Sequence, residues 1–285
     1  MESLDFTKTS QSPIYDPVTA VAFFKSTGTA ESVAQGETFF VEHQQHRGMF
    51  QQDAKMYLLV KGEVSLMIGK KVIDTLKPGE IFGEIAAISE MPRSATAVAK
   101  TACRVISMGM SRFHEALRRT PEFALMLMSI MIDRLRLTNA MLSMRHALPT
   151  AAEPHEGRVF EKAILADLLR KAGGIVPLRF LPRKPIMTAG ETGLHMYVVL
   201  EGRVAVSVQD KVVERIGPGG VLGEMALIDN SPRAASAVAE TDCALLPVSR
   251  NDFLALIKKN PSFAVSLLKT LADRLRFMTS HLPSS

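Results

Sequence analysis

The chain has 285 residues, of which 47% are hydrophobic and 22% are charged, and its formal net charge at pH 7 is +5. This composition excludes a globally disordered chain, and the length suggests two domains. The basic residues are scattered, without the continuous stripe that nucleic-acid binding requires, so we expect no DNA partner. Cys103 and Cys243 lie in apolar stretches without C-x-x-C spacing, so we expect buried thiols and no metal site.

The N-terminal segment carries no recognisable targeting signal. Residues 1–20 lack the basic and apolar regions of a signal peptide. A membrane-spanning helix needs roughly 20 apolar residues in a row, and the apolar run FALMLMSIMI at 123–132 is too short. We therefore expect a cytoplasmic protein without a membrane partner.

One helix and a series of short strands are expected in the first half. An Asp-Pro pair at 16–17 favours the start of a helix that ends at Gly28. Residues 57–68 are rich in Val, Leu, Ile and Tyr and contain a glycine, which predicts a strand with a bend. Turn signals at 69–71 and 78–79 follow, at the spacing of roughly 8–12 residues that is typical of a small barrel or jelly roll.

Helices are expected to close this half. Ser111 is predicted to cap a short helix, and the pair at 120–121, Thr-Pro, predicts the start of a longer one. The Met-rich helix at 123–144 has two interpretations. It packs on its own barrel or on the other domain, or it exposes an apolar face that another protein recognises. It carries an apolar stripe at a spacing of four residues: Phe123, Leu127, Met131 and Leu135.

The second half repeats the first. MYLLVKGEV recurs as MYVVLEGRV, GEIAAISEMPR recurs as GEMALIDNSPR, and DRLR recurs unchanged, each 140 residues further on. The sequence therefore predicts two domains, 1–145 and 158–285, joined by a linker at 146–157. The predicted class is α+β: two tandem jelly-roll-like β-rolls, each with flanking helices.

The two copies differ upstream of the repeated strands. The second copy has Gly190 and Gly193 in a short turn between strands. In the first copy a longer polar segment, 43–55, takes its place, and we expect it to close over a pocket or to contact a partner. His43 and His46 within it are expected to be solvated, because no carboxylate or cysteine cluster joins them.

The repeated glycine segment carries the chemistry. A glycine after a strand lets the backbone approach a ligand, and a helical turn that begins there presents free N–H groups that favour a phosphate. Glu84 can accept a hydrogen bond from a hydroxyl, and Arg93 can donate a fork of hydrogen bonds to phosphate oxygens. Glu224 and Arg233 repeat this set. The alternative for each arginine is a surface cation or an ion pair with its own glutamate.

The pattern G-E-x-A-x-x-x-x-x-P-R-x-A-[ST] resembles the phosphate-binding cassette of cyclic-nucleotide-binding domains, a family that includes the catabolite activator protein and the regulatory subunits of protein kinase A. The resemblance implies that Glu84 and Glu224 bind the ribose 2′-hydroxyl and that Arg93 and Arg233 bind the cyclic phosphate. The expected site residues are Phe82, Gly83, Glu84, Ile85, Ala86, Arg93, Ser94, Ala95, Thr138 and Asn139 for site 1, and Leu222, Gly223, Glu224, Met225, Ala226, Arg233, Ala234, Ala235, Met278 and Thr279 for site 2.

The resemblance also bears on the base. In the family, Ala after the cassette arginine goes with cAMP, so Ala234 favours cAMP in site 2, whereas Ser94 leaves cAMP and cGMP open in site 1. Thr138 and Asn139 resemble the positions through which the catabolite activator reaches adenine. The alternative is that both are solvated helix positions. Copy 2 has Met-Thr at 278–279 instead, which implies an apolar cover for its base.

These observations predict a receptor rather than an enzyme. No Ser/His/Asp order, H-E-x-x-H motif or P-loop occurs, so we expect no catalytic residue, catalytic cofactor or metal. The predicted function is a receptor for a cyclic mononucleotide, cAMP with cGMP as the alternative. It would signal through a ligand-driven helix movement to an unidentified effector protein or a homodimer. The alternatives are a regulatory subunit of a kinase or other effector enzyme, and a scaffold with retired nucleotide sites.

Overall fold

The protein divides into two compact units. The computed structural model describes residues 14–44, 54–146, 148–149, 155–157, 160, 170 and 176–281. The units are Met1–Leu127 and Met128–Pro283, so most of helix α4 (Phe123–Met144) belongs to the second unit. The predicted linker at 146–157 lies partly outside the described residues, and the domain boundaries at 145 and 158 stay a prediction.

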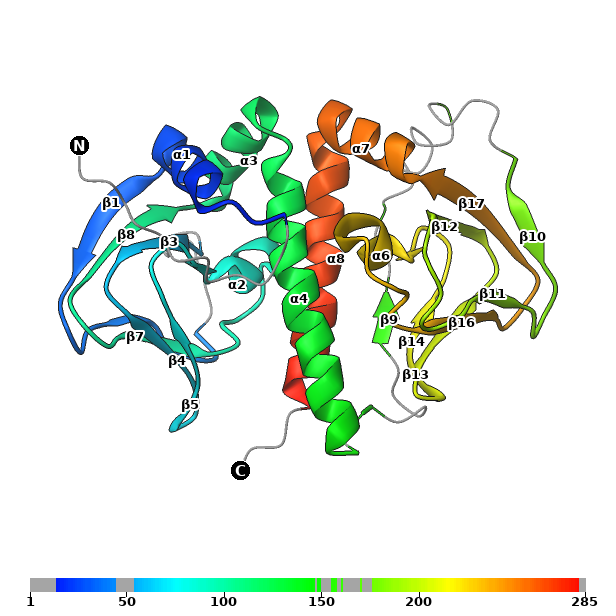
Figure 1. The fold of residues 1–285 in the computed structure, drawn as a ribbon, viewed down its shortest axis with the longest axis horizontal. Helices are drawn as coiled ribbons and strands as arrows, with labels where there is room; N and C mark the ends of the chain where they lie inside the picture. The colour runs from blue at the N-terminus through cyan, green and yellow to red at the C-terminus, as the bar shows by residue number, and fades with distance from the viewer. Residues whose placement is uncertain are drawn as a thin grey trace. The chain divides into compact units, whose positions relative to one another are not determined.

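The first unit is a β-roll of two antiparallel sheets, with orders β1-β8-β3-β6 and β2-β7-β4-β5 (Figure 1). Helix α1 contacts both α3 and β8, so these helices cover one end of the roll. The elements in chain order are α1 (Pro17–Thr27), β1 (Thr29–Val33), β2 (Thr38–Phe40), β3 (Met56–Lys61), β4 (Val64–Ile68), β5 (Lys71–Leu76), β6 (Ile81–Phe82), α2 (Glu84–Ser89), β7 (Thr96–Ala99), β8 (Cys103–Met108) and α3 (Met110–Arg119).

The second unit has the same architecture with one added strand. Its sheets have the orders β10-β17-β12-β15 and β11-β16-β13-β14-β9, and β9 is parallel to β14. Besides α4, the elements are β9 (His155–Gly157), β10 (Leu178–Phe180), β11 (Pro185–Met187), β12 (His195–Glu201), β13 (Val204–Val208), β14 (Lys211–Ile216), β15 (Val221–Leu222), α6 (Glu224–Asp229), β16 (Ser236–Ala239), β17 (Cys243–Ser249), α7 (Arg250–Lys259) and α8 (Pro261–Ser280).

Each roll encloses an apolar core between its two sheets. Leu59 and Val64 are fully buried in the first core, and Val204 and Leu245 occupy the second. Neither roll closes into a barrel over the residues described. The predicted α+β class, with two tandem β-rolls and flanking helices, is confirmed.

Several helix boundaries follow from local capping, and two differ from the sequence prediction. The Asp16 carboxylate accepts hydrogen bonds from the backbone of α1, which ends before Gly28 as predicted. Helix α3 begins at Met110 after Gly109, so the prediction that Ser111 caps it is wrong. Helix α4 begins at Phe123 rather than next to Thr120, because a turn intervenes in which the Phe123 amide donates to the Thr120 carbonyl.

The predicted apolar stripe of α4 is buried. Phe123, Leu127 and Met131 have no exposed surface, whereas Leu137 and Met144 are 58% and 82% exposed. One face of the helix therefore contributes to a core, and another face near its C-terminal end is open to solvent. The stripe packs in a core, as the first interpretation predicts, and recognition of the exposed face by another protein stays a prediction.

The remaining sequence predictions concern cysteines and histidines. Cys103 and Cys243 are buried free thiols, as expected. His43 is exposed and lies 3.5 Å from the Glu42 carboxylate, while His46 and most of the segment 43–55 fall outside the described residues. Within the part of the chain that is described, no group of three His, Cys, Asp or Glu side chains is placed to hold a metal ion.

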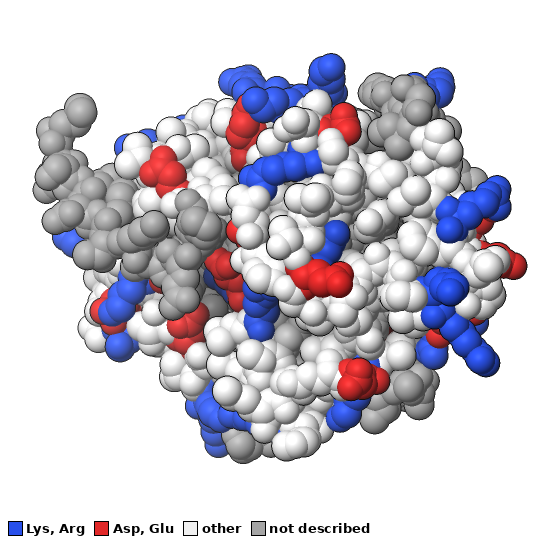
Figure 2. Space-filling model, turned by 45° about the vertical axis from the view of Figure 1, so that its right-hand side comes forward, with Lys and Arg blue, Asp and Glu red and all other residues white. Residues whose placement is uncertain are grey.

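The distribution of surface charge and the length and polarity of the helices were compared with what nucleic-acid binding and membrane insertion require. On the face drawn in Figure 2, basic and acidic side chains are interspersed, and the described residues form no continuous basic band there. No helix among the described residues is both long and apolar enough to cross a membrane.

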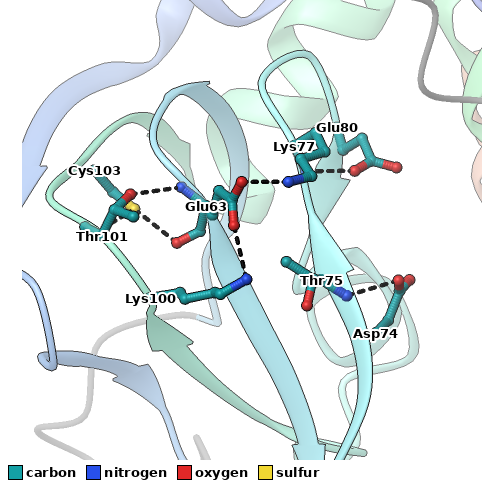
Figure 3. Close-up of polar contacts among 8 residues, drawn as sticks. All are labelled: Glu63, Asp74, Thr75, Lys77, Glu80, Lys100, Thr101 and Cys103. Atoms are coloured by element: carbon teal, nitrogen blue, oxygen red, sulfur yellow. Dashed lines mark hydrogen bonds and ion pairs between the residues drawn. The ribbon is translucent and has the colours of Figure 1, made fainter.

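A cluster of charges around Glu63 ties two turns of the first unit together (Figure 3). The Glu63 carboxylate forms ion pairs with Lys77 and with Lys100, the latter at 2.9 Å. The Glu63 amide donates to the Thr101 hydroxyl at 2.9 Å, and the Lys100 amide donates to the Glu63 carbonyl at 2.8 Å. Hydrogen bonds from the two lysines lower the pKa of Glu63 from 4.5 to about 2.

This cluster predicts an acid-sensitive contribution to stability. Because the folded pKa of Glu63 is depressed, its contribution is present above about pH 4.5 and is lost as the pH falls towards about 2. Urea unfolding at a series of pH values should show a smaller acid-induced loss for Glu63→Gln than for the parent chain. The difference should shrink at high salt, because salt screens exposed ion pairs. Identical acid profiles at low salt would contradict the assignment.

Candidate functional site

Each roll places a glycine in a left-handed conformation immediately before a short helix. Gly83 precedes α2 with φ of 73°, and Gly223 precedes α6 with φ of 82°. A Cβ atom at Gly83 would lie 2.9 Å from Nη1 of Arg93, and one at Gly223 would lie 2.4 Å from Nη1 of Arg233. Only glycine therefore allows both the backbone turn and the close approach of the guanidinium.

Arg93 is buried beneath this turn in the first unit. Its Nη1 donates to the Gly83 carbonyl at 2.8 Å and its Nη2 to the Lys55 carbonyl at 2.9 Å. The guanidinium carbon lies 4.1 Å from the centre of the Phe40 ring. Burial lowers the pKa of Arg93 to about 10, against the opposing effects of Tyr57 and Glu84, so the group is cationic at neutral pH.

Arg233 repeats this arrangement in the second unit. Its Nη1 donates to the Gly223 carbonyl at 2.7 Å and its Nη2 to the His195 carbonyl at 2.6 Å. The side chain is 7% exposed, and burial lowers its pKa. Among the described residues Arg233 has hydrogen bonds to carbonyl oxygens but no ion pair, so the alternative of a surface cation or a pair with its own glutamate does not describe it.

Glu224 pairs with a different arginine, which comes from the last helix. The buried Glu224 carboxylate accepts from Nη1 of Arg274 on α8. Nε of Arg274 lies 2.9 Å from the Glu214 carboxylate, and its Nη2 donates to the Val221 carbonyl at 2.7 Å. Burial acts to lower the pKa of Arg274, but the two carboxylates outweigh it and raise that pKa. Burial also raises the pKa of Glu214.

Neither Arg274 nor Glu214 was among the residues expected for site 2. Arg274 belongs to the repeated DRLR segment, so its recurrence was visible, but nothing local linked it to the cassette. An acid recurs at the position of Glu214, since the first copy has Asp74 there, but nothing local in the sequence indicates that Glu214 is buried. A contact 50 residues away along the chain, such as Arg274 with Glu224, depends on the packing of α8.

A pocket opens beside the second cassette, between its strands and two helices. It brings together nine of the ten residues expected for site 2, with Thr279 as the exception, and it adds Glu214 and Arg274. Thr279 instead donates its hydroxyl to the Leu275 carbonyl at 2.7 Å. The lining residues are Leu135, Asn139, Met187, Val206, Val208, Val213, Glu214, Ile216, Leu222, Gly223, Glu224, Met225, Ala226, Arg233, Ala234, Ala235, Arg274, Phe277 and Met278.

Asn139, expected in site 1, lines this second pocket. Its Oδ1 atom is buried and has no hydrogen-bond partner among the described residues. Thr138 does not line the pocket, and its hydroxyl donates to the Arg134 carbonyl at 2.8 Å, which is ordinary bonding within a helix. Within the second unit, helix α4 thus supplies one unsatisfied polar atom to the pocket.

An ion pair holds this part of α4 to the second cassette. Nε of Arg136 lies 2.8 Å from Oδ2 of Asp229, the last residue of α6, and Nη2 donates to Oδ1 at 3.3 Å. The Asp229 Oδ1 atom also accepts from the Ser231 amide at 3.0 Å. A two-pronged arginine–carboxylate pair of this kind fixes orientation as well as distance, which keeps Asn139 at the pocket.

The first cassette shows the same backbone and arginine geometry. Phe82, Glu84, Ala86 and Ala95 are buried around Arg93, and Ile85 and Ser94 are partly exposed. Of the residues expected for site 1, the structure joins Gly83 and Arg93 by a hydrogen bond, and the roles of the others stay a prediction.

Relatives of known identity match parts of the chain. A cyclic AMP receptor protein of Thermus thermophilus is 42% identical over 98 residues, 33% of this chain and 45% of the relative. A cyclic nucleotide-gated potassium channel of Rhizobium etli is 36% identical over 117 residues, 41% of this chain and 32% of the relative. The matches thus span less than half of either relative.

Two solved structures are also similar. One is the catabolite activator protein of Thermus thermophilus, with 36% identity, coverage of 39% of this chain and 54% of that one, and a TM-score of 0.34. Another is the regulatory domain of Toxoplasma gondii PKA with cAMP, with 20% identity, coverage of 83% and 84%, and a TM-score of 0.30.

The family model of the cyclic nucleotide-binding domain matches residues 31–120 and again residues 177–260. Together the two matches cover more than half of the chain, and each contains one of the buried glycine–arginine cassettes. The chain therefore belongs to the cyclic nucleotide-binding domain family, of which it carries two tandem copies.

Proposed function

We propose that this protein is a receptor for a cyclic mononucleotide, with cAMP as its ligand, and that it transmits occupancy to a partner without catalysing a reaction. One observation carries the proposal: Arg233 is a buried cation held by carbonyl oxygens, without an ion pair among the described residues, at the edge of a largely apolar pocket. A buried charge without a counter-charge is costly, and a phosphate that binds there removes the cost.

The pocket divides into parts that suit the parts of a nucleotide. Arg233 and the backbone of the cassette turn face the position proposed for the cyclic phosphate. Glu224 is the acceptor for the ribose 2′-hydroxyl, and valine, methionine and Phe277 side chains suit the face of a base. The same phosphate and ribose roles are proposed for Arg93 and Glu84 in the first unit. The similarity to a cyclic AMP receptor protein favours cAMP, with cGMP as the alternative.

Arg274 links the ribose position to the last helix. Its Nη1 donates to Oε1 of Glu224, the carboxylate that is proposed to accept from the ribose hydroxyl, and its backbone belongs to α8. A ligand hydroxyl that binds Glu224 therefore changes the hydrogen bond between Glu224 and Arg274. Because Arg274 belongs to α8, this change alters the position of that helix. The free energy for this response is the difference in ligand affinity between the two helix positions.

The base contact proposed for Asn139 belongs to the second site. Its buried and unsatisfied Oδ1 atom lines that pocket, and the Arg136–Asp229 pair keeps it there. A base amino group that donates to this oxygen would remove an unsatisfied buried acceptor.

The output is proposed to be an effector protein or a second copy of this chain. Leu137 and Met144, which are exposed on α4, provide apolar surface for either. Light scattering with and without cAMP tests the second copy, and a monomer under both conditions would remove it.

Calorimetric titration with cAMP and with cGMP tests the ligand. We expect two cAMP sites per chain, with Arg93→Ala and Arg233→Ala each abolishing one or weakening it by about 100-fold, because each removes two hydrogen bonds from a charged donor. Arg203→Ala is the control, since Arg203 is half-exposed and pairs with Glu240. Ligand at about 100 times its dissociation constant should stabilise the fold by about 2.7 kcal/mol. Absence of both heat and stabilisation with either nucleotide would refute the receptor.

Removal of Arg274 tests the linkage between the pocket and α8. Arg274→Met leaves two buried carboxylates without their cation, so we expect a loss of about 3–5 kcal/mol in the free energy of unfolding at pH 7. Burial raises the pKa of Glu214 and Arg274 opposes that rise, so removal of Arg274 raises this pKa further and the deficit should diminish as the pH falls. The double variant Arg274→Met/Glu214→Gln, which has one buried charge fewer, should recover part of the loss. Unfolding in urea measures all three chains, and a deficit below about 1 kcal/mol would refute the buried network.

A further inference from the structure

Glu214 is a buried carboxylate that faces the second pocket. It is 7% exposed and lies on β14, where the strand contains a bulge. Glu214 pairs with Val206 and Val212 pairs with Ser207, so Val213 is an extra residue on this strand. Both Val213 and Glu214 are buried and line the pocket, although neighbours on a regular strand point to opposite faces. The bulge thus directs the carboxylate into the pocket.

The fold does not require a buried acid at this position. The first roll has the same bulge, where Leu66 pairs with Asp74 and Met67 pairs with Val72. Asp74 is nevertheless exposed, and its Oδ1 accepts from the Thr75 amide at 2.7 Å (Figure 3). The buried charge of Glu214 is therefore particular to the second site.

The charges and acceptors around Glu214 favour a ligand group that donates hydrogen bonds. Two carboxylates, Glu214 and Glu224, share the single guanidinium of Arg274, while Arg233 sits at the cassette. A carboxylate can accept about four hydrogen bonds, and Glu214 accepts only from Nε of Arg274 in the described contacts. Asn139 adds a second acceptor, because its buried Oδ1 has no partner among the described residues.

We propose that Glu214, together with Asn139, determines base specificity in the second site by accepting hydrogen bonds from the amino group of a purine. This inference rests on the proposed function and deepens it. Adenine offers its N6 amino group and guanine its N1–H and N2 amino group, so either cyclic nucleotide has the required chemistry. The apolar residues around Glu214, among them Val206, Val208 and Phe277, exclude water and strengthen such a bond.

The test compares two amino-bearing cyclic nucleotides with a purine cyclic nucleotide that lacks the amino group. Calorimetry on the full chain measures the dissociation constants of cAMP, cGMP and purine riboside 3′,5′-cyclic monophosphate, which lacks the amino group. The second site is identified as the one that Arg233→Ala removes. In the parent chain we expect an amino-bearing nucleotide to bind this site about 10- to 100-fold more tightly than the amino-free one, as for a hydrogen bond to a charged group. The better of cAMP and cGMP identifies the base.

Two variants and one matched control separate specificity from structure. Glu214→Met removes the acceptor at similar length and should reduce the preference to about threefold or less, and Glu214→Gln should retain part of it. Asp74→Met makes the same change at the equivalent exposed position and should leave the preference intact.

If Glu214 only positioned Arg274, its replacement would weaken the binding of all three nucleotides equally. The preference for the amino group would then persist, and this result would overturn the proposal. A parent chain without any preference at this site overturns it regardless of how the variants fold. Loss of all nucleotide binding in the parent chain instead refutes the receptor itself, and the proposal with it.

Discussion

The burial of one guanidinium beneath a left-handed glycine is the constraint on which each site depends. The arginine must reach the carbonyl of that glycine and a second carbonyl at the start of the neighbouring strand, as Arg233 does with Gly223 and His195. This fixes the strand, the turn and the short helix relative to one another. It also buries a cation where water solvates it poorly. The binding of an anion at this position is therefore favourable. Arg93 repeats the arrangement, with Phe40 against the guanidinium.

A buried ion pair connects the second cassette to a helix that lies far away along the chain. Glu224 follows the cassette glycine directly, yet its partner is Arg274, which comes from the last helix. The carboxylate therefore serves both the proposed ribose position and the docking of α8. Because the network is buried, with weak screening by water, a change at one member affects the others more than it would at the surface.

The two copies have the same backbone arrangement, but equivalent side chains differ in burial and in their contacts. The same bulge occurs on β5 and β14, but one presents an exposed aspartate and the other a buried glutamate. Likewise, the extra acceptor of the second pocket comes from α4, which the Arg136–Asp229 pair holds at that cassette. Repetition of the fold thus preserves the glycine–arginine geometry of the cassette, while the side chains around it differ between the two copies.

The sequence by itself determined the two β-rolls, the cassettes and the buried helix stripes, because these depend on short-range patterns: glycine and proline at turns, and apolar residues at helical spacing. It placed the start of α4 two residues too early, since a turn in which the Phe123 amide donates to the Thr120 carbonyl precedes the helix. Only the tertiary structure decided that Glu224 pairs with Arg274, that Glu214 enters the pocket and that Asn139 lines the second site. Those contacts join residues 50 or more positions apart, or depend on a bulge, and no local periodicity encodes such choices of partner.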